Sequence, residues 1–298
     1  VIDSSSEEPH ISQEFKEFLI KEKISFQIIC RSNLYPGKAR NIGIKESSYE
    51  TIAFLDIMTI PSSNWLNDNY RMLYAKNHDG IWGSTSYEAS TKLNKIIRAS
   101  TFGDLPIRTL PGSLIKKTAF EYSGLFIEST RAGEDADWMH RTGLHPIAFQ
   151  DSVTQLKYIG LKDIRFTVLL QKWFRNYFYS AQLPYLNPHK DVYFYFIAVF
   201  MILLAFNWNT LSYDESLRGW NTNSLAYVPN ITKLSIFFFG SIYVAFRGIF
   251  IPFRKGVAFN YILLNLPFII GVSLLLDIVK ASAFLIARIY TLKKIKNF

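Results

Sequence analysis

The chain has 298 residues, 49% of them hydrophobic, which suits one large domain or two smaller ones with a sizeable core. Its net charge of +9 is unevenly spread: residues from 191 onward hold ten Lys or Arg and four acidic residues, whereas the preceding part holds 23 basic and 20 acidic ones. The excess therefore flanks the apolar C-terminal runs, as at a membrane edge, which argues against a nucleic-acid-binding groove. A single cysteine, Cys30, excludes an intrachain disulfide.

Residues 1–170 carry the pattern of an α/β domain. Segments 26–30 and 51–56 are short apolar runs of strand length, and segment 12–23 has apolar side chains at helical spacing after Ser12, a residue type favoured at helix N-caps. Strands that alternate with helices predict a mixed, mostly parallel sheet with helices on both faces. Ligands of such sheets bind at the C-terminal ends of the strands.

The start of the chain, "VIDSSSEEP", is apolar and then turns, as if a strand were already under way. We therefore expect the chain to lack its natural N-terminal start, and with it a first apolar strand. Asp3 and Asp56 both fall at predicted strand ends, so we expect both at the ligand-binding edge of the sheet.

Residues 191–298 are predicted to form a membrane region with two to four helical segments, joined to the α/β domain by an interfacial linker at 171–190. The run 192–213 contains no charged residue and is long enough to span a bilayer core. The run 231–246 is shorter, and 256–276 is uncharged again. Buried core helices of a soluble protein are the alternative interpretation.

The basic residues predict the orientation of these segments. Positive charges precede the first apolar run and follow the second, whereas the loop between them is poor in Lys and Arg. This bias predicts a multi-pass protein of the cell membrane with its N-terminal domain in the cytoplasm. Three spans would export Lys293, Lys294 and Lys296, so two alternatives stay open: residues 277–298 form an interfacial amphipathic helix, or the third run is re-entrant.

Three clusters in the N-terminal part carry candidate chemistry. In chain order they are "VIDSSSEE", "KARNIGI" followed by "TIAFLDIMTIPSSNWL", and "GSLIKKTAFEYSGLFIESTRAGEDADWMHRTG". The sequence contains no H-E-x-x-H zinc motif, no G-x-S-x-G nucleophile motif and no G-x-x-x-x-G-K phosphate-binding loop. Their absence from the sequence argues against hydrolase and nucleoside-triphosphatase functions.

Together, these clusters resemble glycosyltransferase family 2, the inverting enzymes with a nucleotide-sugar-binding α/β fold. The resemblance covers roughly the first 145 residues and rests on the order and spacing of several short motifs. It implies a membrane-anchored member that lacks its first strand. It also implies transfer of a hexose-like sugar from a nucleoside diphosphate to an acceptor hydroxyl.

The resemblance implies donor-binding roles for Asp3, Arg40 and Asn41. Asp3 matches the acid that reads the nucleobase, because a carboxylate accepts the ring N–H of a uracil- or guanine-type base. Arg40 and Asn41 match an "ARNxG" helix start near the nucleotide, where a basic residue and a helix N-terminus favour phosphate. An ordinary turn acid for Asp3, and local packing and capping for Asn41, are the alternatives.

Asp56 matches the first acid of the D-x-D motif of that family, which holds a divalent cation on the donor diphosphate. Mg²⁺ and Mn²⁺ prefer carboxylate and phosphate oxygens as ligands. Met58 stands where the second acid is expected, and its thioether is a poor ligand for such ions. We therefore expect the donor site here, with a weak cation site on Asp56 or with Arg40 taking over part of the charge.

Asp135, in "GEDADW", matches the E-D motif, whose Asp is the general base that removes the proton of the acceptor hydroxyl. Glu134 is expected to orient the acceptor or the loop. Acids that stabilise a helix N-terminus are the alternative. Segment 171–178, "QKWFRNYF", lacks the spacing of the processive-synthase motif Q-x-x-R-W, so we expect an amphipathic helix at the membrane interface.

The sequence thus predicts a membrane-bound inverting glycosyltransferase for a lipid-linked or cell-envelope glycan acceptor, as in polysaccharide biosynthesis, with no nucleic-acid partner. The alternative is a catalytically degenerate transferase-like domain that acts as a membrane scaffold or partner-binding module. Met58 is the residue that favours the alternative.

Overall fold

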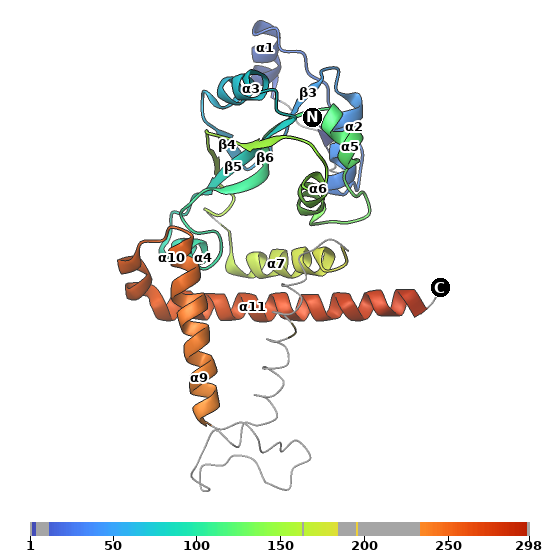
Figure 1. Cartoon of the computed structure of the whole chain (residues 1–298). Coiled ribbons are helices and arrows are strands. Elements are labelled where there is room, and N and C mark those ends of the chain that lie inside the picture. The colour runs from blue at the N-terminus through green and yellow to red at the C-terminus, as the bar shows by residue number, and fades with distance from the viewer. Residues whose placement is uncertain (1, 4–11, 163, 184–194, 196–232, 297–298) are drawn as a thin grey trace.

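The computed structural model describes residues 2–3, 12–162, 164–183, 195 and 233–296. In its N-terminal part, short strands alternate with helices (Figure 1). In chain order the elements are β1 (Ile2–Asp3), α1 (Gln13–Lys21), β2 (Ile29–Cys30), α2 (Pro36–Glu46), β3 (Thr51–Ala53), β4 (Thr59–Pro61), α3 (Trp65–Ala75), β5 (Gly80–Tyr87), α4 (Lys92–Thr101), β6 (Ile107–Lys116), α5 (Thr118–Ser123), α6 (Glu134–Thr142), β7 (Phe149–Asp151) and β8 (Leu156–Tyr158).

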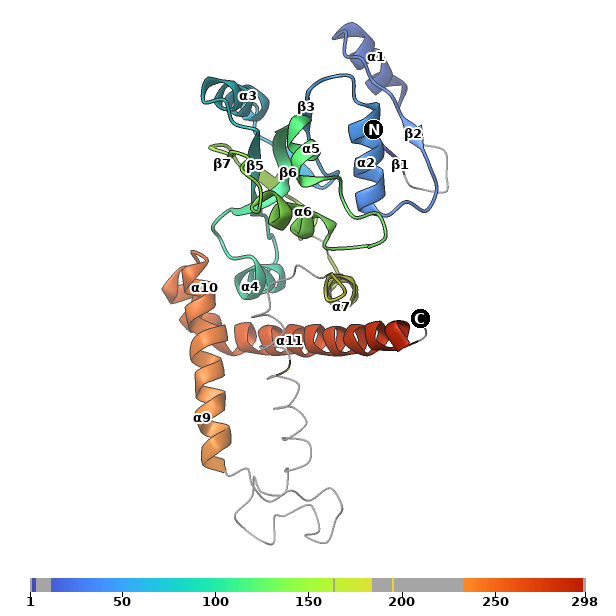
Figure 2. The ribbon, with the colours of Figure 1, turned by 45° about the vertical axis from the view of Figure 1, so that its right-hand side comes forward.

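The C-terminal part is helical. Its described elements are α7 (Phe166–Ser180), α9 (Lys233–Tyr243), the π-helix η3 (Val244–Phe250), α10 (Ile251–Arg254) and α11 (Phe259–Lys296). Helix α7 lies between the α/β domain and α11, and α9 runs crosswise to α11 in both ribbon views (Figures 1 and 2). The expected linker boundary at residue 170 falls inside α7.

The strands form a six-stranded mixed sheet and a separate pair. The central path is β3-β6-β5-β8-β4, β7 also pairs with β5, and β1 pairs with β2. The predicted mixed α/β class is confirmed, but its parallel share is smaller than expected: β6 is antiparallel to both β5 and β3. The reason is that β6 returns along β5 after α4, a path that the apolar runs do not specify because antiparallel and parallel strands share the same apolar pattern.

Several local predictions are confirmed. Helix α1 begins after Ser12, whose hydroxyl accepts a hydrogen bond from the Phe15 backbone N–H at 3.3 Å. The "ARN" segment lies in the helix α2. The predicted strand at 51–56 is shorter than expected: β3 ends at Ala53 and β4 begins at Thr59, so Asp56 lies in the turn between them and not at a strand end.

The core beneath the α6 end of the domain is aromatic. Trp138 of α6 is fully buried and packs against Trp82 of β5, with ring centroids 5.8 Å apart, and against Phe120 at 4.8 Å and Phe126 at 5.2 Å. The indole N–H of Trp138 donates to the Gly124 carbonyl at 2.8 Å. This packing fixes α6 on the sheet, and with it the acids of its first turn.

The predicted membrane region is described only in part. The run 192–213 lies outside the described residues, apart from Tyr195. The described part of the run 231–246 corresponds to α9 and the start of η3, and the run 256–276 covers the residues just before α11 and its first part. Among the described residues, one helix, Phe259–Thr291, is long and apolar enough to cross a membrane, by length and composition alone.

Candidate functional site

The turn between β3 and β4 presents the first candidate acid. The Asp56 carbonyl accepts hydrogen bonds from the Thr59 backbone N–H at 2.9 Å and from its hydroxyl at 2.6 Å, which closes the turn. The Asp56 side chain is therefore held at the surface and is 48% exposed. Partial burial of the carboxylate is the main cause that raises the pKa of Asp56. The charge of Arg40 opposes this rise, the charge of Asp135 adds to it, and that of Lys172 opposes it.

Arg40 of α2 joins this turn to the second acid-bearing element. One terminal guanidinium nitrogen lies 3.8 Å from an Asp56 carboxylate oxygen, and the other donates a hydrogen bond to Glu134 of α6. The guanidinium also lies over the Phe126 ring, 5.7 Å from its centroid. Three segments that are far apart in sequence thus meet at one cation. Helix α2 begins at Pro36, so Arg40 lies in its second turn and not at the helix start that we expected.

Asn41, predicted to bind the donor, has a different place. It is buried, and its side-chain N–H group donates to the Phe126 carbonyl and to Glu128, each at 2.9 Å. Its side-chain oxygen accepts from the Phe126 backbone N–H, also at 2.9 Å. This side chain therefore fixes the loop before α6 to α2, and the packing alternative is the one that fits.

The acids of α6 divide into one supporting pair and one open group. Gly133 precedes them with a φ of +89°, in the left-handed region, and starts the helix so that Glu134, Asp135 and Asp137 share its first turn. Asp137 is buried and accepts from Arg141 at 2.8 Å. Arg141 also donates to the carbonyls of Ser123 and Leu125. This pair is structural, because its groups hold α6 to the loop after α5.

Glu134 is buried and Asp135 is half-buried. One Glu134 oxygen accepts from Arg40, and the other has no hydrogen-bond partner among the described residues. Burial, and next the charge of Asp135, raise the pKa of Glu134 despite the opposing charge of Arg40. The Asp135 carboxylate uses one oxygen to accept from the Ala136 backbone N–H at 2.8 Å. Asp135 is therefore the member of the pair that faces outward with acceptor capacity to spare.

Three residues that we did not predict complete this region. Lys172 of α7 donates to the Tyr158 hydroxyl at 3.2 Å, and Tyr158 packs beside Tyr87 with ring centroids 5.0 Å apart. Burial is the main cause that raises the pKa of Tyr87, and the charges of Asp135 and Asp56 add to it. The charge of Lys172 acts on Asp56, and the charges of both acids act on Tyr87. The only sequence feature that could have indicated Lys172 is its place in "QKWFRNYF", which we assigned to a membrane interface.

Asp3 is the last residue of β1 and pairs with Cys30 of β2. Strand β1 lies beside α2, since a Cβ on Gly43 would come within 3.7 Å of Ile2. The backbone of Asp3 is therefore next to the helix that carries Arg40. Its nucleobase-reading role stays a prediction.

The groups around Asp56 include the cation Arg40 and the charge of a second acid, Asp135. Within the described residues no three His, Cys, Asp or Glu side chains gather as a set that could hold a metal ion. The guanidinium of Arg40 already faces Asp56, and the Met58 side chain is 47% exposed beside it. A phosphate group bound here would pair with Arg40 and Lys172, the two cations whose charges act on Asp56 together with the opposing charge of Asp135.

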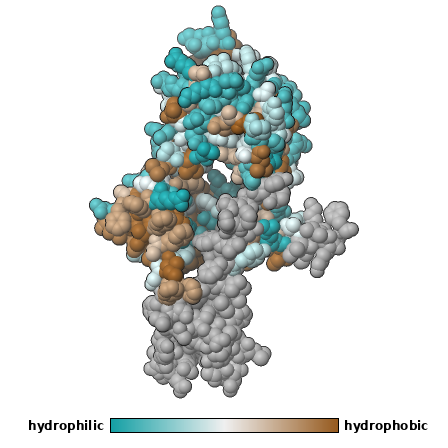
Figure 3. Space-filling model, viewed as in Figure 1, coloured by the Kyte–Doolittle hydropathy of each residue, from teal (hydrophilic) through white to brown (hydrophobic). Residues whose placement is uncertain are grey.

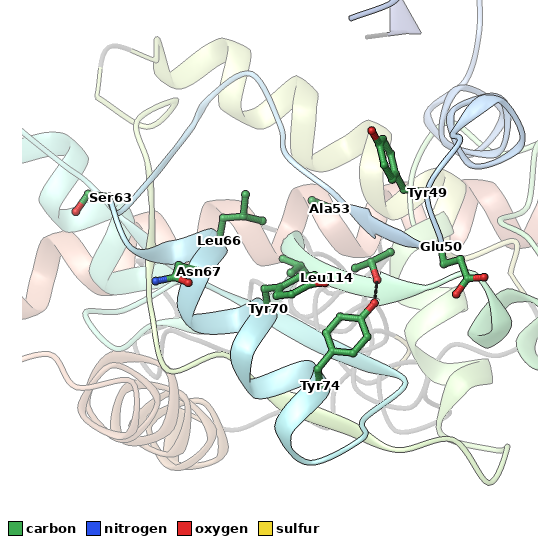
Figure 4. A pocket seen from close by; sticks show the side chains of 10 residues that line it. Tyr49, Glu50, Ala53, Ser63, Leu66, Asn67, Tyr70, Tyr74 and Leu114 are labelled. Carbon is green, nitrogen blue, oxygen red and sulfur yellow. Dashed lines mark hydrogen bonds between the residues drawn. The ribbon is translucent and has the colours of Figure 1, made fainter. Parts of the chain in front are cut away.

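A separate hollow lies at the edge of the sheet, between β3 and α3 (Figure 4). Tyr70 and Tyr74 of α3 and Tyr49 line it, and the Tyr74 hydroxyl is 2.8 Å from the Thr51 hydroxyl. None of the candidate acids, nor Arg40, is among its lining residues. The candidate site is therefore the set of charged side chains on α2, the β3–β4 turn, α6 and α7, and not this hollow.

Comparisons with solved structures give glycosyltransferase neighbours at low identity. The crystal structure of GalNAc-T7 with UDP, GalNAc and Mn²⁺ is 13% identical, with a TM-score of 0.37 over 53% of this chain and 36% of that one. The structure of S. aureus TarS residues 1–349 with UDP-GlcNAc is 15% identical, with a TM-score of 0.38 over 94% and 80% of the two chains.

A longer S. aureus TarS structure is 14% identical, with a TM-score of 0.34, and this chain spans 39% of its length. This chain thus spans well under half of both GalNAc-T7 and the longer TarS. No family model matches the sequence, and no curated protein matches it. We therefore argue function from the geometry of the site.

Proposed function

We propose that this protein is a membrane-associated glycosyltransferase that moves a sugar from a nucleoside-diphosphate donor to a hydroxyl of a lipid-linked or cell-envelope glycan acceptor. The observation that carries the proposal is the position of Arg40, between Asp56 of the β3–β4 turn and Glu134 of α6, the residue before Asp135. Diphosphate recognition needs cations, and deprotonation of a hydroxyl needs a carboxylate within hydrogen-bond reach. The candidate site supplies both a cation and a carboxylate from adjacent elements.

The proposed reaction divides the candidate site into a donor half and an acceptor half. Arg40 and Lys172 neutralise the donor diphosphate, and Asp135 accepts the proton of the acceptor hydroxyl. The acceptor oxygen forms a bond to the anomeric carbon as the bond from that carbon to the phosphate oxygen breaks, and the nucleoside diphosphate leaves with the electron pair. Attack from the face opposite the leaving group inverts the anomeric centre. Pre-placed charges of this kind stabilise the developing negative charge without reorganisation.

Glu134 has a supporting role in this proposal. Its ion pair holds the Arg40 guanidinium in place, and its first-turn position fixes the spacing between that cation and Asp135. Mg²⁺ or Mn²⁺ is proposed to bind only together with the donor, whose phosphate oxygens would supply most of its ligands, with Asp56 as the protein carboxylate that faces it.

The test is transfer by the full chain in detergent across a panel of UDP- and GDP-sugars, with a membrane lipid extract as the source of acceptor. Release of nucleoside diphosphate that depends on the extract supports the proposal. The Asp135→Asn variant is the matched control, because it keeps the size of the side chain. No release with any donor would overturn the assignment.

Met58 favours a second candidate, a transferase-like domain that binds a partner at the membrane without turnover. In a D-x-D site the second acid would stand there, and this thioether offers a hard cation little. A thermal-shift titration separates the two candidates. A donor-induced rise in melting temperature that Arg40→Ala removes supports the enzyme, whereas no shift with any nucleotide supports the scaffold.

A further inference from the structure

Helix α11 is too long for a simple membrane span. It has 38 residues, so at about 1.5 Å of rise per residue it is about 57 Å long, against about 30 Å for the hydrocarbon core of a bilayer. It is also apolar around its whole circumference, since its hydrophobic side chains follow no single face. Length and composition alone do not say whether such a helix crosses a membrane or lies along it, so its contacts decide.

One side of α11 is covered by the α/β domain and α7 along most of its length. Near its start, Ile262 and Ile269 are buried against Ile96 and Ala99 of α4. Farther along, Val272 contacts the cluster that includes Trp173 of α7. Near its end, residues Ala281, Phe284 and Ala287 are buried with Tyr177 and Phe178 of α7.

The chain just before α11 contacts the α/β domain, and α11 contacts α7 near Tyr290. Just before its first turn, the Lys255 carbonyl accepts from the backbone N–H groups of Asp104 and Leu105, at 2.9 Å and 3.0 Å. Near the other end, the Tyr290 ring lies 6.1 Å from the ring of Phe178 in α7. Because α7 lies between the α/β domain and α11 (Figure 1), a helix held at these two places cannot carry its ends to opposite sides of a membrane while the contacts persist.

The opposite side of α11 is an exposed apolar stripe. The stripe follows helical spacing from one end of the helix to the other, and Leu264 in it is 81% exposed. Its large members are Leu263, Leu264, Phe268, Leu274, Leu275, Ile286, Ile289 and Tyr290. In the space-filling view the apolar surface gathers over α9, α10 and the start of α11, whereas the α/β domain above is mostly hydrophilic (Figure 3).

The charged groups of this region face away from the stripe or border it. Asp277 and Lys280 are buried on the covered side, where Asp277 accepts from Arg247 at 2.7 Å and 2.9 Å and lies 3.6 Å from Lys280. At the border, Lys92 of α4 lies 5.6 Å from the Phe268 ring centroid. Arg254 is exposed just before α11. A basic rim beside an apolar stripe complements anionic lipid headgroups.

We infer that α11 lies flat in the membrane interface, with its exposed stripe in the acyl boundary of a lipid bilayer and both ends on the side of the α/β domain. A transmembrane α11 would draw α4 and α7 into hydrocarbon together with Lys92, Lys95, Lys172 and Arg175, which is unfavourable for each charge. The in-plane position avoids this. It also keeps Lys293, Lys294 and Lys296 on the side that the positive-inside bias requires.

The inference has a consequence for the site, which rests on the proposed function. Helix α7 lies between α11 and α6 (Figure 1), and a Cβ on Gly133 would come within 3.0 Å of the Ser180 side chain. Only α7 and α11 therefore lie between the helix that carries Asp135 and the lipid face. An acceptor carried on a lipid would meet the base close to the membrane surface.

The test measures depth. In full-length protein with Cys30→Ser, reconstituted in vesicles with anionic lipid, single nitroxides replace Leu264, Phe268, Leu275 and Ile286 through cysteine. Accessibility to oxygen and to a water-soluble nickel chelate gives the depth of each. The in-plane helix predicts one common depth for all four. A spanning helix predicts a difference of about 33 Å between positions 264 and 286, and that result, or water exposure of all four, would overturn the inference.

Helix α9 supplies the matched control, because it runs crosswise to α11 (Figure 2). Nitroxides at Phe239 of α9 and at Phe246 of η3, which follows it directly, should differ in depth by about 10 Å. Sidedness gives a second readout that does not use depth. Cys30 is exposed on the α/β domain, so in sealed vesicles an impermeant maleimide should label Cys30 and a cysteine at Thr291 from the same side. Labelling from opposite sides contradicts the in-plane position.

Discussion

The proposed acceptor half and donor half of the candidate site are built differently. On the acceptor side, α6 is fixed by the buried Trp138, by the Asp137–Arg141 ion pair and by the close contact of Gly133 with α7. On the donor side, Asp56 stands in an exposed turn whose other polar contact is a 3.8 Å approach of Arg40. We therefore propose a base that is held in place before binding and a phosphate site that the donor itself completes.

The largest expected effect comes from the fixed half. Asp135→Asn keeps the shape of the side chain but removes the base, so turnover should fall about 10²- to 10⁴-fold. Steady-state assays of the full chain in detergent measure this. Asp137→Asn is the contrasting variant: it should lower the melting temperature by weakening the buried pair with Arg141, by about 1–3 kcal/mol of unfolding free energy. Near-normal turnover of Asp135→Asn would remove it as the base.

Arg40 is where the two halves meet, so its loss should affect the donor most. Arg40→Ala removes charge-assisted hydrogen bonds worth about 1.5–3 kcal/mol, which corresponds to a donor affinity lower by about 10- to 100-fold. Calorimetry with the donor and inhibitory nucleotides measures this. Lys38→Ala, an exposed basic residue of the same helix, is the control that should leave affinity unchanged.

The open half can be sharpened by restoring the acid that it lacks. Met58→Asp adds a second carboxylate two positions after Asp56, and two carboxylates hold a hard cation better than one. The variant should bind donor several-fold more tightly in Mn²⁺ than in EDTA, whereas the unmodified chain should show a smaller dependence. An equal dependence in both would mean that position 58 does not face the cation. Asp56→Asn should weaken donor binding more with metal than without it.

Gly133 tests how tightly the base is held. An alanine there adds a Cβ at a φ of +89° and within 3.0 Å of Ser180 and Leu183. We expect a loss of about 1–2 kcal/mol of stability from the left-handed backbone alone, together with lower turnover because α6 must shift. Gly240→Ala, where a Cβ meets nothing within 4 Å, is the matched control. Unchanged stability and turnover in Gly133→Ala would show that the acceptor half is not tightly constrained.

The smallest effect is a pH dependence from Glu134. Its pKa is raised above the ordinary 4.5 mainly by burial, so as the pH rises through that window the unfolded chain releases the proton before the folded one does. Glu134 therefore lowers stability progressively above about pH 4.5. Glu134→Gln removes this term, so its melting temperature relative to the unmodified chain should increase from pH 4 to pH 7. A constant difference would contradict the raised pKa.

The sequence motifs indicated which charged residues lie near one another, but not the residues that surround them. The order of the motifs brought Arg40, Asp56, Glu134 and Asp135 into one expected site, and the structure places Arg40 between Asp56 and Glu134, the residue before Asp135. Lys172 and Tyr87 were missed because neither residue lies in one of the motifs. The elements that carry them, α7 and β5, come near the acids only through the tertiary fold. Asn41 was misassigned because a motif position does not reveal whether its side chain faces ligand or loop.

The membrane part shows the same limit of a pattern in another form. Hydropathy found the apolar run in α11, and the interfacial alternative for residues 277–298 followed from the charges at the end of the chain. Hydropathy does not say what covers a helix. The contacts of Ile262 with α4, and of Phe284 with α7, are long-range, and they alone distinguish a helix that crosses the bilayer from one that lies along it.

The proposed division of the candidate site into a donor half and an acceptor half is tested most directly by donor titration of three proteins side by side. The unmodified chain, Arg40→Ala and Asp135→Asn are titrated with the same nucleotide-sugar under the same conditions, which needs no knowledge of the acceptor. We predict that Asp135→Asn binds the donor like the unmodified chain, whereas Arg40→Ala binds it about 10- to 100-fold more weakly. Weak binding by Asp135→Asn together with normal binding by Arg40→Ala would contradict the account.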